Sequence, residues 1–314
     1  MVTINLVDYP RLSRSSISPE VEAKSGIETV SVKGGKIDVL TADGRRDNDG
    51  HTIILTEPYS GYVGRLDDIV RHKVIASQLG ARVIAIDNIG VGIGTSHRIP
   101  DGVYEGLNEG NFTALALLQW EALLSRENIL EDGSLSIVGN SLGVASAAAL
   151  AATAPEDKSI DRLVLIEGVS QPGSLGSLAM RFISEMNDWG DYKNNNDPVY
   201  RELQRKARLS NFGRWAYIYA NALTNPRVGL DIMKAVQQQS FSETAHLDIV
   251  NGSRSRVSPT TDNEMLARQC RLHTDGTFGS PDMLHTVLRD ESHGIIDDLS
   301  KYAHLLGLLL TPRG

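Results

Sequence analysis

The chain has 314 residues, a formal net charge of −8 and 41% hydrophobic residues, a composition typical of folded globular proteins. The negative charge and the absence of any basic block argue against a nucleic-acid partner. The single cysteine, Cys270, excludes an internal disulfide, and its helix-like surroundings favour a buried residue over a catalytic thiol. The N-terminus lacks a signal-peptide pattern and no apolar run is long enough to span a bilayer, so we expect no membrane span and a cytoplasmic location.

Strand-like and helix-like runs alternate along the chain, which predicts an α/β fold with a mostly parallel sheet and crossover helices. Two of the runs flank Gly34-Gly35 and predict a hairpin at the sheet edge, and Gly80 is expected to end the first helix. We expect strands at 27–32, 36–42, 51–56, 82–87, 135–138, 163–166, 246–250 and 283–288. We expect helices at 63–79, 111–124, 144–153 and 295–310.

The rhythm changes after Gln171, because the chain then has only helix-like, aromatic-rich stretches until about residue 240. We interpret residues 171–240 as an inserted helical cap, or lid, and residues 1–170 and 241–314 as the core. Most apolar cap residues should form the cap's own core. Some should face the cleft, because ligand sites favour domain interfaces, and this predicts a largely apolar small-molecule substrate. The candidates are Met180, Phe182, Met186 and Trp189.

Residues 139–143 read Gly-Asn-Ser-Leu-Gly and match the pattern G-x-S-x-G. The motif follows a predicted strand directly and opens an alanine-rich helix, which is the strand–turn–helix setting of a nucleophilic serine. Such a turn strains the backbone of Ser141, and the flanking glycines remove side chains that would collide. The hydroxyl is then placed at a helix N-terminus, which favours developing negative charge. An ordinary serine N-cap is the alternative.

Three segments together resemble the α/β-hydrolase superfamily: the motif at 139–143, the strand and loop at 84–96 and the tripeptide at 292–294. The loop is similar to a D-x-x-G-x-G-x-S pattern, and the resemblance covers nearly the whole chain outside the insertion. It implies an α/β-hydrolase sheet with an inserted helical cap. The G-N-S-L-G form is similar to esterases and to carbon–carbon hydrolases that cleave ring-fission diketones. Val144 departs from many relatives, which have another glycine there.

A serine hydroxyl needs an adjacent base near neutral pH, and in this fold the chain order is serine, acid, histidine. Of the histidines after Ser141, only His293 directly follows the last predicted strand and precedes the last helix. A loop at that point can bring the ring to the serine. The family's histidine occupies the same place, so the resemblance also implies His293 as the base.

The acid departs from the family pattern. Relatives carry it in a G-x-x-D-x-x-V-P-like segment, and residues 252–259 of this chain have Ser255 in its place. A hydroxyl cannot supply the negative charge that stabilises an imidazolium. Glu167 is the first candidate, because it ends an apolar strand, where a carboxylate needs a partner, and some haloalkane dehalogenases of this fold carry their acid there. A structural Glu167, with Asp262 or Asp248 as the acid, is the alternative.

The resemblance also implies an oxyanion hole made by the backbone N–H groups of Tyr59 and Leu142. An ordinary turn at residues 57–61 is the alternative. We expect no cofactor, because the glycine-rich segment 90–94 lacks both the G-x-G-x-x-G spacing and a P-loop lysine. We expect no metal, because the carboxylates near His293 lack paired histidines at ligand spacing.

These features predict a cofactor-free serine hydrolase that uses a Ser-His-acid triad. Its substrate would be an ester, a thioester or an activated carbon–carbon bond. An acyltransferase would use the same residues and exclude water. A non-catalytic ligand-binding protein on the same fold is the alternative from another class. A dehalogenase is excluded, because it would need Asp in place of Ser141. The oligomeric state stays open.

Overall fold

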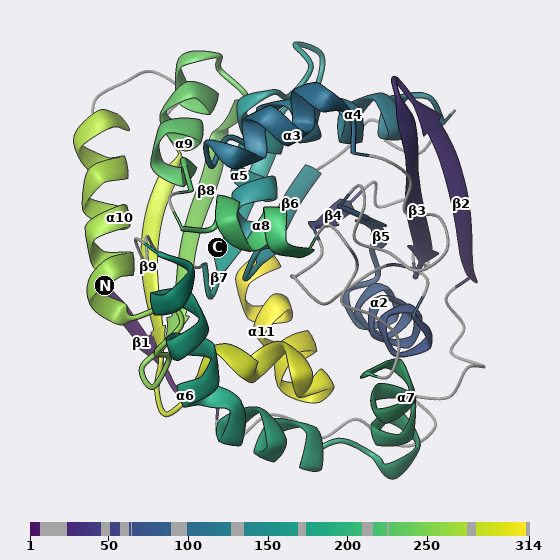
Figure 1. The fold of residues 1–314 in the computed structure, drawn as a ribbon, viewed down its shortest axis with the longest axis vertical. Coiled ribbons are helices and arrows are strands. Elements are labelled where there is room, and N and C mark those ends of the chain that lie inside the picture. The colour runs from purple at the N-terminus through teal and green to yellow at the C-terminus, as the bar shows by residue number, and fades with distance from the viewer. Residues whose placement is uncertain are drawn as a thin grey trace.

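The computed structural model describes residues 1–6, 24–44, 51–56, 63, 65–88, 99–126, 135–168, 174–208, 216–224, 226–274 and 281–311. Within these residues one nine-stranded sheet runs through the molecule in the order β1-β9-β8-β7-β6-β4-β5-β3-β2 (Figure 1). Neighbouring strands pair in parallel except β2 with β3 and β3 with β5. The strands are β1 (Val2–Ile4), β2 (Lys24–Val32), β3 (Gly35–Asp43), β4 (Thr52–Thr56), β5 (Arg82–Ile86), β6 (Leu135–Asn140), β7 (Ile160–Ile166), β8 (Phe241–Gly252) and β9 (Asp282–Leu288).

Helices cover both faces of the sheet, and Figure 1 shows α3, α4 and α9 along the top of the view and α2 and α11 in its lower half. No helix among the described residues is both long and apolar enough to cross a membrane. The helices are α2 (Leu66–Leu79), α3 (Asp101–Asn108), α4 (Thr113–Leu124), α5 (Gly143–Ala152), α6 (Leu175–Asn194), α7 (Pro198–Arg208), α8 (Ala216–Ala222), α9 (Val228–Gln237), α10 (Thr260–Thr274), the 3-10 helix η1 (His293–Asp297) and α11 (Leu299–Leu310).

Two hydrophobic cores lie on opposite faces of the sheet, because successive strand residues point to opposite sides. Ile54 of β4 packs in the core with α4, α5, α9 and α10, whereas its neighbours Ile53 and Leu55 pack in the core with α2 and α11. The strands in the middle of the sheet are therefore apolar on both faces, as a parallel sheet covered by helices requires. This confirms the predicted α/β class and the mostly parallel sheet.

The predicted hairpin forms at the sheet edge, with β2 and β3 paired antiparallel through Val32 and Gly35. The prediction of one helix over 295–310 was wrong, because η1 and α11 are separate helices. Asp298 lies between them with an extended backbone, and its side chain accepts a hydrogen bond from the Lys301 N–H at 3.1 Å. Asp298 therefore acts as the N-cap of α11, and the axis of α11 need not continue that of η1.

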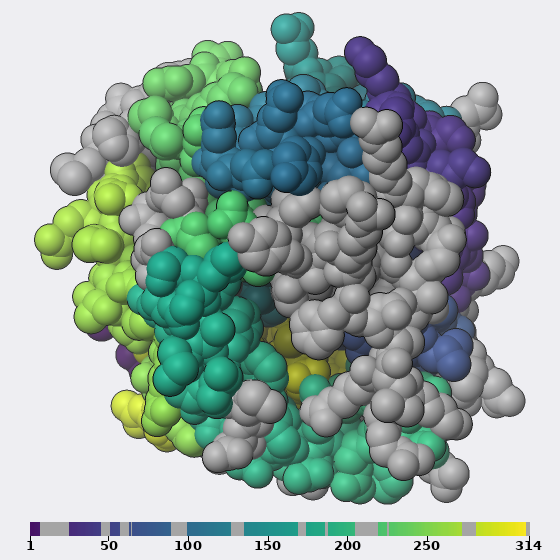
Figure 2. All heavy atoms as spheres, in the orientation of Figure 1, coloured from purple at the N-terminus to yellow at the C-terminus, as the bar shows by residue number. Residues whose placement is uncertain are grey.

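The segment between β7 and β8 contains α6, α7, α8 and α9 among its described residues. Helix α6 packs against η1, α7 against α2 and α8 against α3, whereas α9 lies against α5 on the sheet. The division into a core and a cap of residues 171–240 stays a prediction. Figure 2 shows α6 at the surface of the molecule on the viewer's side. One face of α6 is therefore open to solvent, and another contacts η1.

Two glycines test how far local backbone conformation contributes to stability. Gly80 ends α2 in the left-handed region with φ 59°, as expected from the sequence, and nothing crowds its Cβ position. Gly80→Ala should therefore lower the free energy of unfolding by about 1 kcal/mol through backbone strain alone. Gly190→Ala, in the uncrowded interior of α6, should raise it by about 0.5–1 kcal/mol. Urea denaturation of both variants measures the contrast, and equal effects would contradict it.

Candidate active site

Ser141 stands at a sharp turn between β6 and α5 and has a left-handed backbone with φ 56°. Its N–H donates to the Ile166 carbonyl at 3.0 Å, which fixes the turn against the end of β7. A Cβ on Gly139 would overlap the Gly143 backbone, and a Cβ on Gly143 would overlap the Thr56 carbonyl. The glycines of the motif are therefore needed for close approach, and the backbone strain is borne by the serine itself.

His293 begins η1 after the last strand, and its Nε2 lies 2.9 Å from the Oγ of Ser141. Both residues are buried, with 5% and 4% of their surfaces exposed. The contact joins residues that are 152 positions apart in the chain. A neutral imidazole at this distance can accept the hydroxyl proton, which is the geometry that general-base activation of a serine requires.

Glu167 lies at the end of β7 with a left-handed backbone of φ 54° and no exposed surface. Its Oε1 accepts a hydrogen bond from the Gly252 N–H, and its Oε2 lies 3.5 Å from the His293 Nδ1. That distance is longer than a hydrogen bond and close enough for an ion pair when the ring is protonated. Neither the Nδ1 nor the Oε2 has a hydrogen-bond partner among the described residues. The structure thus brings together Ser141, His293 and Glu167.

Burial raises the pKa of the Glu167 carboxyl above its usual range. The neighbouring His293 ring, the Ser255 side chain and the Gly252 N–H act against this rise in pKa, because each favours the charged form. Ser255, just after the end of β8, therefore lies next to the Glu167 carboxylate at the end of the neighbouring strand β7. Its Oγ also accepts a hydrogen bond from the Ser258 N–H at 3.0 Å, which holds the loop after β8.

The other two candidate acids are held elsewhere. Asp262 lies in α10 and pairs with Arg181 of α6 at 3.2 Å. Asp248 lies within β8, opposite Val164 and Leu284 in the neighbouring strands, and is fully buried. Among the three candidate acids, Glu167 is the one with a carboxylate oxygen 3.5 Å from the His293 Nδ1 within the described residues.

Of the two predicted oxyanion donors, Tyr59 lies outside the described residues, as does the glycine-rich segment 90–94. Leu142 is fully buried and stands at the N-terminus of α5. Within the described part of the chain its N–H has no hydrogen-bond acceptor, because the first bonds of the helix are donated by Val144 and Ala145. An unused N–H beside the serine hydroxyl is available to an oxyanion.

A family model described as "alpha/beta hydrolase fold" matches residues 66–228, which is more than half of the chain. The chain belongs to the α/β-hydrolase fold family. Comparison with curated proteins finds no match.

Solved α/β-hydrolase structures resemble this one over most of its length. An enol-lactonase from Burkholderia xenovorans LB400 is 16% identical with a TM-score of 0.59, and the match covers 91% of this chain and 100% of that one. A thermostable carboxyl esterase from Bacillus coagulans is 11% identical with a TM-score of 0.58, covering 91% and 99%. A bromoperoxidase from Bacillus anthracis is 15% identical with a TM-score of 0.58, covering 91% and 100%. At identities this low, the structural likeness shows a shared fold and nothing finer.

Two aromatic rings of this α/β-hydrolase lie against the histidine, and both come from α6. The ring of Phe182 meets the His293 ring edge-on at 5.6 Å between centroids, and the ring of Trp189 lies 6.3 Å away. Met180, by contrast, is 64% exposed, and the side chain of Met186 is outside the described residues. Phe182 and Trp189, two of the four candidates, therefore lie at the histidine.

Two other kinds of chemistry, metal binding and a reactive thiol, can be examined in the described part of the chain. Within the described ranges no group of three or more His, Cys, Asp or Glu side chains could hold a metal ion. Cys270 is buried, and burial raises the pKa of its thiol to about 12, so it stays protonated near neutral pH. This agrees with the buried, non-catalytic role expected for it.

Sequence reasoning missed two α6 residues that contact the histidine loop. Glu185 accepts a hydrogen bond from the His293 N–H at 2.9 Å, and Tyr192 accepts one from the Ser292 N–H at 2.7 Å. The spacing of Phe182, Glu185 and Tyr192 places them on one helical face, which was the available signal. Which loop this face meets depends on tertiary packing, which local spacing does not predict.

The raised pKa of Glu167 predicts a pH-dependent contribution to stability. Protonation is favoured in the folded state, so this contribution is present below the ordinary pKa of 4.5 and is lost as the pH rises through the folded-state pKa. The free energy of unfolding of the wild type relative to Glu167→Gln should therefore fall as the pH rises above the ordinary pKa of 4.5. Urea denaturation across this range measures the difference.

A matched control is Asp231→Asn in α9. Burial raises the pKa of Asp231 to about 6, and the charges that act on it are those of Lys234 and Arg227 in or next to α9. It should give the same direction of pH dependence and leave any activity unchanged. A difference between wild type and Glu167→Gln that is constant with pH, beside a sloping one for Asp231→Asn, would contradict the assignment for Glu167.

Proposed function

We propose that this protein is a cofactor-free serine hydrolase in which Ser141 is the nucleophile, His293 the base and Glu167 the acid. The observation that carries the proposal is the buried 2.9 Å contact between the Ser141 Oγ and the His293 Nε2. A serine held in a strained left-handed turn, with a histidine at hydrogen-bond distance, has the requirements of an activated nucleophile.

In the proposed reaction the His293 Nε2 takes the hydroxyl proton as the Ser141 Oγ attacks a carbonyl carbon. The negative charge then develops on the carbonyl oxygen, and the Leu142 N–H would stabilise it, with the Tyr59 N–H as the second donor. The imidazolium returns its proton to the leaving group, which gives an acyl-enzyme that water hydrolyses. A negative charge on Glu167, 3.5 Å from Nδ1, would stabilise the imidazolium while it exists.

We propose an ester, a thioester or an activated carbon–carbon bond of a largely apolar small molecule as the substrate. The support is the pair of rings at the histidine, Phe182 and Trp189, which give the site apolar surface. In this proposal residues 171–240 form the cap over the site, and the protein acts in the cytoplasm. The names of two structures with the same fold, an enol-lactonase and a carboxyl esterase, are in keeping with an ester substrate.

The main rival is a ligand-binding protein on the same fold, which Ser255 in the family's acid position favoured. The approach of Glu167 to the histidine weakens this rival, because it offers a carboxylate from another strand. An acyltransferase would share the first half of the reaction and pass the acyl group to an acceptor other than water.

Ser141→Ala should abolish turnover and keep the fold. If the three residues act together, loss of the nucleophile should cost on the order of 10⁶ in kcat. Hydrolysis of a short p-nitrophenyl ester measures this loss, and labelling of the wild type by a fluorophosphonate probe tests the activated serine directly. Equal ester hydrolysis by wild type and variant, with no labelling, would favour the ligand-binding protein.

Glu167→Gln should lower kcat by up to about 10⁴, because it keeps the shape and removes the charge. Adding Ser255→Asp to this variant should restore at least a tenfold part of the loss (roughly 1.4 kcal/mol), since it returns a carboxylate to the loop after β8. The control is Ser255→Asn in the same background, which can still accept from the Ser258 N–H and carries no charge. Equal kcat for the two double variants would contradict an electrostatic role for the acid.

A further inference from the structure

One face of α6 is committed to the loop that carries the histidine. Residues 182, 185, 189 and 192 are spaced by three, four and three positions, which places them on a single helical stripe. All four contact Ser292 or His293. Phe182 and Trp189 lie against the His293 ring, Glu185 binds the His293 N–H, and Tyr192 binds the Ser292 N–H.

Glu185 uses both carboxylate oxygens, and the two partners come from different loops. Its Oε1 accepts from the His293 N–H at 2.9 Å, after β9, and its Oε2 accepts from the Val257 N–H at 2.6 Å, after β8. The side chain has no exposed surface. A buried carboxylate with two charge-assisted bonds is a strong tie, and loss of either bond leaves a buried donor without a partner. Glu185 therefore joins the base loop to the loop that carries Ser255.

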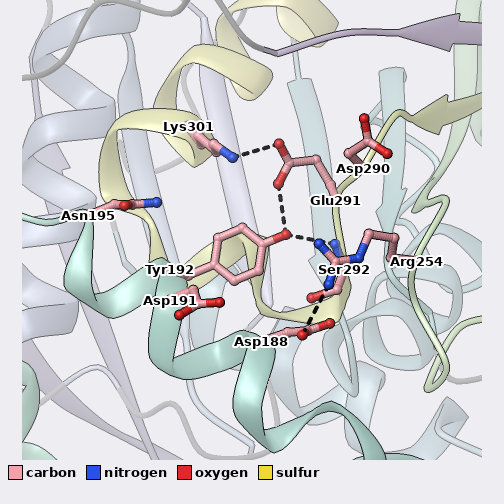
Figure 3. A pocket seen from close by; sticks show the side chains of 9 residues that line it. All are labelled: Asp188, Asp191, Tyr192, Asn195, Arg254, Asp290, Glu291, Ser292 and Lys301. Carbon is pink, nitrogen blue, oxygen red and sulfur yellow. Dashed lines mark hydrogen bonds and ion pairs between the residues drawn. The ribbon is translucent and has the colours of Figure 1, made fainter.

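Tyr192 makes a second tie about two helical turns further along α6. Figure 3 shows its hydroxyl between the Glu291 carboxylate, to which it donates at 2.7 Å, and the Ser292 N–H, from which it accepts. Burial and the neighbouring Glu291 raise the pKa of Tyr192, so the hydroxyl keeps the proton that it donates. Lys301 holds the other oxygen of Glu291 at 2.6 Å. The network fixes the backbone just before His293 from the outer side.

The packing between the two ties leaves little freedom. A Cβ on Gly294 would overlap the rings of Trp189 and Tyr192, so α6 approaches the backbone of η1 directly. Ring packing and hydrogen bonds from one face of α6 therefore act together on the position of the histidine. Displacement of a catalytic group by about 1 Å can cost about 10²-fold in rate, so these contacts bear on chemistry as well as on folding.

We propose that Glu185 is a positioning residue for His293, through which α6 sets the base at its distance from Ser141. This inference rests on the proposed serine-hydrolase function. Glu185 does not touch the reacting atoms. It acts through the backbone N–H of the histidine, and Tyr192 supports it through the preceding N–H.

Glu185→Gln is the sharpest variant, because it keeps the volume and turns an N–H donor of the new amide toward one of the two backbone N–H donors. We expect kcat for a p-nitrophenyl ester to fall about 10²-fold with KM within about twofold, at a temperature where the variant is folded. Tyr192→Phe keeps the ring packing and removes the hydroxyl, and it should give a smaller fall in kcat of the same kind. If Glu185→Gln does not fold, Tyr192→Phe alone tests the positioning role.

The matched control is Asp161→Asn. Asp161 also holds a backbone N–H with a carboxylate oxygen, that of Leu135 at 3.1 Å, but at the opposite ends of the strands from Ser141. It should lower stability without changing kcat. If Glu185→Gln and Tyr192→Phe lower stability and leave kcat as Asp161→Asn does, the positioning role is overturned and the proposed hydrolase function stands.

A wild type without Ser141-dependent turnover would instead refute the proposed function, and the NMR signals of the His293 ring then decide about Glu185. With ¹³C-labelled histidine, a sharp single ring signal in the wild type that broadens or moves in Glu185→Gln supports positioning. An unchanged signal in both α6 variants overturns it. The shift of that signal in Asp161→Asn gives the background for the comparison.

Discussion

The site depends on one electrostatic constraint: the carboxylate of Glu167 has no exposed surface and must be stabilised by groups of the protein. The groups that favour its charged form come from two places in the chain: the Gly252 N–H and the Ser255 side chain after β8, and the His293 ring after β9. Each lies at or just beyond the end of a strand, so the parallel register of β7, β8 and β9 is what brings them together. The order of the strands thus decides which groups can stabilise a negative charge on Glu167.

Two neighbouring strands end in the same unusual way. Ser141 after β6 and Glu167 after β7 both have left-handed backbones, with φ of 56° and 54°, and neither is a glycine. Such conformations cost of order 1–3 kcal/mol each and persist where the surrounding structure fixes them. Their N–H groups donate into the next strand, that of Ser141 to Ile166 and that of Glu167 to Val250. The strain of the nucleophile and that of the acid are therefore supported by successive strands of one sheet.

Much of this arrangement could be predicted from local sequence. The alternation of apolar strands and helices gave the α/β class, the strand–turn–helix setting indicated Ser141, and chain order indicated His293. For the acid, the sequence made Glu167 the first candidate and left Asp262 and Asp248 open. Local patterns missed β1, which is only three residues long, and α3, where Gly102 and Gly106 weaken the helical signal. They also missed Glu185, because its partners belong to loops more than 70 residues away and are fixed only when α6 packs on η1.

Gly252 links the two halves of the site in a way that limits how the chain can vary. Its N–H binds the Glu167 carboxylate, and a Cβ at this position would overlap the Glu291 carbonyl, next to the backbone of Ser292. Gly252 therefore donates a hydrogen bond to the acid and also packs directly against the backbone of the loop that carries the base. Any side chain at residue 252 would push the loop of the base away or move the N–H that binds Glu167. Evolution is therefore expected to keep glycine here, and to change the acid and the base loop only together.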